Sequence, residues 1–218
     1  MRANRKELKN DTEWALVRNQ AATAGAANTG RSLGSMENWI GATSPSSVSA
    51  TNVILATSAI GVGSWDEVAS GAPGAIVDEG TTAAFVEADL RLALQGAWDD
   101  GGDPDTILCA ASVKNYINDF TSLATRNVDL GRTQQATITG AADLYVSSFG
   151  VHRVVLHRHT RSNVCLVLDS SLWAVAQLRP FQMERLAKTG DGEKRQMLGE
   201  CTLVCRNWRG NAKVVGIA

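Results

Sequence analysis

The first helical pattern along the chain runs from Glu7 to about Ala24, and it is apolar on two sides. One stripe holds Leu8, Thr12, Ala15, Asn19 and Ala22, and the other holds Trp14, Val17 and Ala21. A helix with two apolar sides lies across other elements instead of on a free surface. We therefore predict one long helix here, with the Trp14 side chain buried.

A second helix is predicted from about Thr82 to Trp98. Its inner face holds Ala83, Val86, Leu90, Ala93, Leu94 and Ala97. Thr81 or Thr82 can cap its start, and Glu87 and Arg91 have the spacing of an i,i+4 ion pair. Glycine favours the left-handed conformation that ends helices, so the Gly101–Gly102 pair predicts the end of this one.

The remainder of the pattern is mostly of the β type. Residues 26–80 are rich in small residues and predict irregular structure with short strands at 53–55 and 75–77. Thr106 to Ala110 predicts a strand and Ser112 to Phe120 a helix. Further strands are predicted at Leu144–Phe149, Val151–Arg158, Val164–Leu168, Leu172–Leu178, Cys201–Trp208 and Ala212–Ile217. We expect Val164–Leu168, apolar throughout, to be central in its sheet. The last two strands are expected to form a hairpin turning at residues 209–211. The fold class is α+β, with helices early and antiparallel strands late.

Composition narrows the class of protein. With 218 residues, 44% hydrophobic and 20% charged, the chain reads as a globular protein of one or two domains. The charge is unevenly distributed: residues 21–150 hold five basic and fourteen acidic side chains, net −9, whereas residues 151–218 carry a net +6. Such a chain can pair head to tail with its copies, or present a basic surface to a polyanion. No apolar run approaches the length of a membrane span, so no membrane partner is expected.

No common catalytic motif is present, and candidate metal ligands are few. His157 and His159 would share one face of a strand near Cys165, which permits a zinc site or simply exposed histidines at a strand end. Asp99, Asp100, Asp103 and Asp105 could bind a cation, or could form a solvated turn after the helix. The sequence leaves both alternatives open.

The four cysteines do not have the pattern of a disulfide scaffold. Cys201 and Cys205 lie on one predicted strand, too far apart to bond to each other. Cys109 and Cys165 lie in apolar runs and are expected to be buried thiols.

Basic side chains near the end of the chain are candidates for contact with phosphates or with a second subunit. They are Arg179, Arg185, Lys188, Lys194 and Arg195. No aromatic residues are interleaved with them, which argues against a base-stacking platform.

Several stretches together resemble the tailed-phage major capsid proteins of the Hong Kong 97-type fold. Glu7–Leu16 is similar to the start of that family's spine helix, and Ala97–Ile107 to its helix-to-strand junction. That family's central hairpin is similar to Leu144–Gly150 with Val154–Arg158. Its C-terminal region is similar to Leu178–Phe181 with Leu186–Asp191 and Gly199–Leu203.

The resemblance implies a peripheral (P) domain, containing the spine helix and a sheet, and an axial (A) domain. The implied boundaries are 1–75 for the first P segment, 76–178 for the A domain, and 179–218 for the P-domain return with the C-terminal hairpin. An N-terminal arm and an extended (E) loop, which the family carries before the spine helix, are expected to be absent from this chain. No catalytic residue, metal or cofactor is implied.

The implied function is a structural one. Copies would form pentamers and hexamers of an icosahedral shell around DNA, assembled in the host cytoplasm and localised to the virion. Other capsid or decoration proteins, and non-specific contact with packaged DNA, are further implied partners. The alternatives are an encapsulin-like nanocompartment shell, an enzyme with an unrecognised site, and a small binding module that uses the basic C-terminal third.

Overall fold

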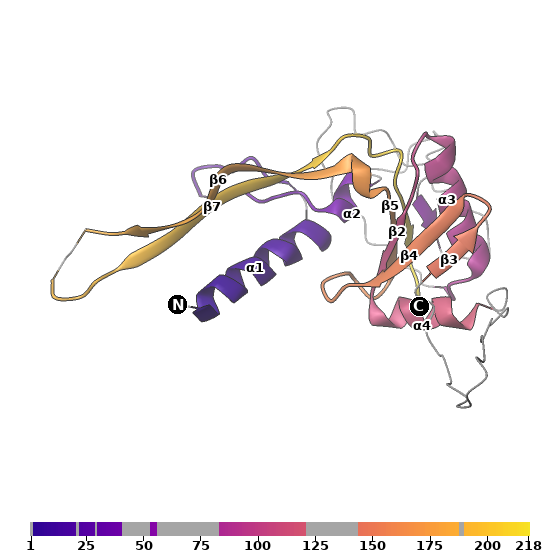
Figure 1. Ribbon diagram of the computed structural model, residues 1–218, viewed down its shortest axis with the longest axis horizontal. Coiled ribbons are helices and arrows are strands. Elements are labelled where there is room, and N and C mark those ends of the chain that lie inside the picture. Colours follow the sequence, from indigo (N-terminus) through magenta and orange to yellow (C-terminus); the bar gives the residue numbers. More distant parts are fainter. Residues whose placement is uncertain are drawn as a thin grey trace, which may run out of the picture.

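The structure is a computed structural model that describes residues 2–20, 22–28, 30–40, 53–55, 83–120, 144–187 and 190–218. It contains a mixed six-stranded sheet and a separate two-stranded ribbon that projects from it (Figure 1). The helices are α1 (Arg2–Val17), α2 (Met36–Trp39), α3 (Glu87–Asp99) and α4 (Ala111–Asp119). The strands are β1 (Val53–Leu55), β2 (Thr106–Cys109), β3 (Leu144–Ser147), β4 (Gly150–Leu156), β5 (Val164–Leu168), β6 (Trp173–Arg185), β7 (Arg195–Cys205) and β8 (Ala212–Val215).

The six-stranded sheet has the order β1-β8-β5-β2-β4-β3. As predicted, β5 is an interior strand and is buried along its whole length. The expectation that the late strands are all antiparallel is only partly right, because β4 pairs with β2 in parallel and β8 pairs with β1 in parallel. Strand β1 confirms the short strand predicted at 53–55, whereas residues 75–77 lie outside the described part of the chain.

Both faces of this sheet are covered at its centre, along β2, β5 and β8. Ile107 and Cys109 on β2 belong to a core cluster that includes α3 and α4, whereas Leu108 between them belongs to a second cluster with Val17 of α1. Side chains alternate between the faces of a strand, so a sheet covered on both sides needs apolar residues at every position. This explains the continuous apolar run of β5 and the apolar residues of β2 after Thr106. Strand β8 follows the same pattern except at Lys213, whose Nζ donates to the Glu37 carbonyl at 2.9 Å. The last turn of α1 is thereby packed on the sheet.

Helix α1 begins and ends earlier than the sequence pattern predicted. It ends at Val17, and the chain beyond it runs back on itself, with Thr23 and Ser32 joined as an antiparallel bridge. Gly25 in this excursion has φ of 81°, a conformation that ends helical geometry. The predicted continuation to Ala24 is therefore wrong, because backbone pairing at Thr23 competes with the helix.

Helix α3 begins at Glu87, five residues later than predicted. The backbone N–H of Ala83 donates to the Gly216 carbonyl at 2.9 Å, and the Ala218 N–H donates to the Ala83 carbonyl at 2.9 Å. These bonds hold residue 83 away from the helix, whose N-cap is Val86. The predicted capping residues, Thr81 and Thr82, lie outside the described residues. Leu90, Ala93, Leu94 and Ala97 are fully buried as predicted, but Val86, at the N-cap, is exposed. The helix ends beside Gly101, whose φ of 82° confirms the predicted stop.

The predicted C-terminal hairpin is wrong in its pairing. Strand β7 pairs with β6, whereas β8 enters the six-stranded sheet between β1 and β5. The turn near Gly210 packs against Gly102, and Asn211 is buried there; its side-chain oxygen accepts from the Asp169 N–H and from Trp173 Nε1. These contacts direct the chain from the ribbon into the sheet.

Candidate interaction surface

The β6–β7 ribbon is the most exposed regular element that the structure describes. Its base is anchored by Leu203, which is 3% exposed, and by the Trp173 indole, whose N–H donates to Asn211 at 2.8 Å. Farther along, large apolar side chains face solvent: Leu178 is 80% exposed and Phe181 is 42% exposed. Two-stranded ribbons are marginally stable alone, and unpaired strand edges are ready to bind other chains. The ribbon therefore has the properties of a contact surface.

Four of the five predicted basic candidates lie on or beside this ribbon, and Lys188 lies outside the described residues. Arg179 Nε lies 3.7 Å from a carboxylate oxygen of Glu200. Arg185 Nε and Arg195 Nη2 share Glu193, at 3.0 and 3.1 Å, and Lys194 adjoins them, exposed to solvent. The structure thus pairs three of these cations with two glutamates, and two of the pairs, Arg179–Glu200 and Arg185–Glu193, cross the ribbon. These pairs offset part of the positive charge that the sequence alone indicated.

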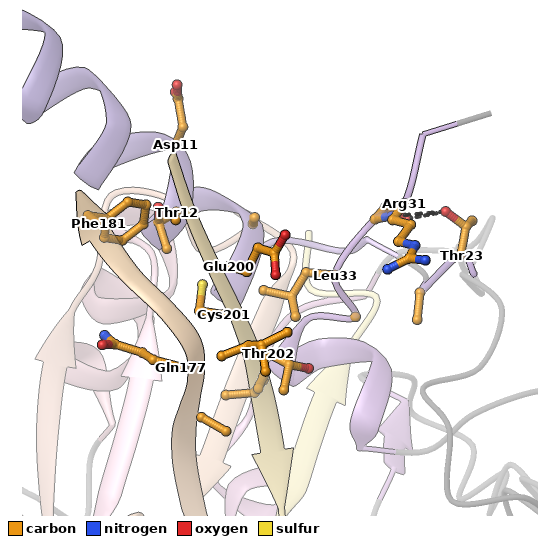
Figure 2. Close-up of a pocket in the computed structure, with 18 of the residues that line it drawn as sticks. Asp11, Thr12, Thr23, Arg31, Leu33, Gln177, Phe181, Glu200, Cys201 and Thr202 are labelled. Atoms are coloured by element: carbon orange, nitrogen blue, oxygen red, sulfur yellow. Dashed lines mark hydrogen bonds between the residues drawn. The ribbon is translucent and has the colours of Figure 1, made fainter. Parts of the chain in front are cut away.

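A groove of about 1020 Å³ separates the ribbon from α1 and from residues 31–34. One wall is lined by Leu8, Thr12 and Ala15 of α1, three of the five residues of the first predicted stripe. Figure 2 shows Thr12, Leu33 and Thr202 contributing to the walls from three separate segments. This side of α1 faces the ribbon across a groove instead of packing in a closed core. The sequence pattern identified the stripe but not what lies opposite it.

Phe181 depends on a glycine in the neighbouring strand. A Cβ atom at Gly199 would collide with the Phe181 ring, so the ring lies directly on the glycine backbone. The β6–β7 register is irregular at this point, with shifts between Gln177 and Arg179 and between Arg179 and Gln182. Irregular pairing bends and twists a ribbon, and here it places Phe181 at the wall of the groove.

Trp14 is not buried, contrary to the sequence prediction. Its side chain is 39% exposed, and the Arg18 guanidinium lies 5.3 Å from the ring centroid. Only the end of α1 packs on the sheet, since Val17 is 5% exposed. Of the second predicted apolar side, Trp14 is thus available for contact outside the chain, whereas Val17 packs on the sheet.

The predicted histidine pair lies beyond the end of β4, half-buried. The rings of His157 and His159 are 5.6 Å apart, and His157 Nε2 lies 3.5 Å from a carboxylate oxygen of Glu13. The His159 backbone N–H donates to His157 Nδ1 at 3.3 Å. Within the described ranges, no three metal-ligating side chains gather, and Cys165 lies in β5 instead. His157 therefore links α1 to the end of β4.

Residues of the acidic turn after α3 form hydrogen bonds with residues 169 and 170. Asp105 accepts from the Ser170 N–H at 3.0 Å and from its hydroxyl at 2.6 Å, and these bonds hold the pKa of Asp105 below its usual value against the opposing effect of burial. The Asp103 N–H donates to Asp169 at 3.1 Å. The turn therefore fixes one end of the sheet.

All four cysteines are free thiols. Cys109 and Cys165 are buried and lie opposite each other on β2 and β5. Burial raises the pKa of the Cys109 thiol to about 11 and raises that of Cys165 as well. A buried thiol of raised pKa is a poor nucleophile, so both act as small core side chains.

A second exposed apolar region lies on the edge strand β3. Leu144 and Val146 are 56% and 69% exposed, and Val151, opposite Val146 on β4, is 58% exposed. Sequence reasoning missed this region because the alternation in β3 resembles that of any half-covered sheet.

Among the described helices, none is long and apolar enough to cross a membrane.

The model of the SU10 major capsid protein family matches residues 1–218. No curated protein matches the chain.

Proposed function

The chain belongs to the SU10 major capsid protein family of phages, and from this premise we infer that its copies assemble as pentamers and hexamers into an icosahedral shell that encloses DNA. The family match over residues 1–218 carries this inference. Membership makes the protein a structural component of the virion rather than an enzyme. Assembly in the host cytoplasm and contact with other capsid or decoration proteins are parts of the same proposal.

The exposed ribbon supports a role in assembly. A shell subunit works by surface complementarity, so its contact surfaces are expected to expose apolar side chains before assembly. Leu178 and Phe181 on the ribbon, and Val146 on the edge of the sheet, are such side chains. We therefore propose that the ribbon and the β3 edge contact neighbouring copies in the shell.

We also propose the two-domain organisation of the Hong Kong 97-type fold. In this proposal, α1 is the spine helix, the ribbon belongs to the P domain, and the six-stranded sheet with α3 and α4 forms the A domain. The sequence-based boundaries were 1–75, 76–178 and 179–218. Because β1 and β8 pair within the six-stranded sheet, we place both of these strands with the middle segment.

Negative-stain electron microscopy of the expressed 218-residue chain tests assembly. We expect shells or capsomer rings, and a monomer that persists at high concentration would contradict the proposal. Nucleic acid inside purified particles would favour a genome-enclosing shell, whereas an enclosed enzyme would favour the nanocompartment alternative.

A pair of variants tests the role of the ribbon. Leu178→Ala removes a side chain that is 80% exposed, so it should change the free energy of unfolding by less than about 0.5 kcal/mol while reducing particle yield. Leu92→Ala, at an exposed position of α3 away from the ribbon, is the matched control and should assemble normally. Equal particle yields for the two variants would remove Leu178 from the interface.

A further inference from the structure

One face of α1 carries a run of basic residues in its N-terminal half. Arg2, Arg5, Lys6 and Lys9 occupy positions i, i+3, i+4 and i+7 of the helix, which lie on one side. We call these four positions the α1 basic stripe. Lys6 and Lys9 are exposed. Figure 1 shows this end of α1 directed away from the six-stranded sheet.

The lysines of the stripe have no acidic partner among the residues that the structure describes. Glu13, one turn after Lys9, lies against His157 instead. The ribbon differs in this respect, since Arg185 and Arg195 both lie against Glu193. Lys6 and Lys9 of the α1 basic stripe therefore carry charge that no described acidic side chain offsets, unlike Arg185 and Arg195 of the ribbon.

The composition of this face favours a phosphate backbone over a protein surface. The apolar residues on the same side of α1, Leu16 and Val17, pack in the cluster on the sheet, so the stripe beyond them offers charge alone. Contacts between proteins are centred on apolar side chains with few charges. A surface of closely spaced cations without apolar residues suits DNA phosphates.

The spacing of the stripe also fits duplex DNA. At about 1.5 Å of rise per residue, its four positions span roughly 10 Å of helix. One DNA strand places a phosphate about every 3.4 Å along the duplex axis, so that length covers roughly three spacings and therefore about four phosphates. We propose that the α1 basic stripe is the surface by which the shell subunit contacts packaged double-stranded DNA, without reading its sequence. This proposal rests on the proposed function as a shell subunit.

The test measures binding of a 20-base-pair duplex to the 218-residue chain by fluorescence anisotropy at several salt concentrations. Four phosphate contacts predict a slope of log K against log salt of about −3.6, or about 150-fold weaker binding from 50 to 200 mM salt. For Lys6→Gln/Lys9→Gln the slope should fall to about −1.8, or about 12-fold weaker binding over the same range. Arg185→Gln/Arg195→Gln removes the same charge from the ribbon and should keep the original slope.

The outcomes separate this inference from the proposed function. Equal slopes for the two double variants, or no change for Lys6→Gln/Lys9→Gln, would overturn the assignment of DNA contact to α1. Loss of particles in Lys6→Gln/Lys9→Gln with an unchanged DNA slope would assign the stripe to contact between copies and also overturn it. Failure of the unaltered chain to form particles, with the slopes as expected, would contradict the shell proposal alone. Glutamine is a good helix former, so we expect the variant to retain α1, and circular dichroism is the control for this.

Discussion

Removing one partner of the buried ion pair between Glu37 and Arg161 should be among the most destabilising single changes to the fold. Glu37 lies on α2 and its side chain is 3% exposed, whereas the Arg161 side chain is 16% exposed. Arg161 donates to the same Glu37 oxygen through Nη2 at 2.7 Å and through Nε at 3.1 Å. The Glu37 backbone carbonyl also accepts from Lys213 Nζ on β8 at 2.9 Å. The pair thus fixes α2 on the sheet.

Glu37→Gln leaves the Arg161 cation buried without its full counter-charge. Removing one partner of a buried pair costs about 3–5 kcal/mol. Because part of the Arg161 side chain remains open to water, we expect the lower end, about 3 kcal/mol, or a fall in Tm of roughly 6–12 °C. Urea unfolding of the unassembled chain, followed by tryptophan fluorescence, measures the change.

A double-mutant cycle provides the control. Glu37→Gln/Arg161→Met removes the Arg161 cation as well, so it should lose less stability than Glu37→Gln alone. Arg91→Gln, in an exposed pair with Glu87 at 3.9 Å, should change stability by only a few tenths of a kcal/mol. A loss below about 1 kcal/mol for Glu37→Gln, or strict additivity in the cycle, would refute the reasoning.

Three further predictions follow from the packing. Gly102→Ala should destabilise by about 1–3 kcal/mol, because the new Cβ would collide with the Gly210 backbone, whereas Gly30→Ala, which meets no neighbouring atom, should cost far less in the same urea assay. His152 is fully buried, and burial lowers its pKa, so on acidification the unfolded chain takes up a proton that the folded chain does not. The free energy of unfolding should therefore fall as the pH drops below about 6.5. In the His152→Asn variant, the urea midpoint should depend less on pH between 7.5 and 5. Trp14→Ala should cost less than about 1 kcal/mol of unfolding free energy because Trp14 is 39% exposed, and a loss near 3 kcal/mol would show it to be packed in solution.

Local sequence patterns were sufficient for most of the elements. The period of the apolar residues located α3, α4 and the interior strand β5, because burial against a sheet needs a fixed spacing of apolar side chains. The glycines after α3 marked its end, since few other residues adopt a positive φ. Resemblance in several short stretches indicated the capsid family, which the family match confirms.

Tertiary contacts decided what these patterns left open. Cys201–Trp208 and Ala212–Ile217 look like a hairpin in sequence, yet β8 pairs with β5 because a buried strand gains more from an interior position than from a local turn. The start of α3 was set by Ala83 pairing with the chain 133 residues later, and Trp14 lies outside because only the last turn of α1 reaches the sheet. The apparent basic patch of the C-terminal third became a set of ion pairs once β6 and β7 were side by side. The sequence by itself determined which residues are apolar enough to be buried and which carry charge. Only the folded chain decided which of these residues contact a partner within the same subunit, because pairing between residues far apart in the chain leaves no local pattern in the sequence.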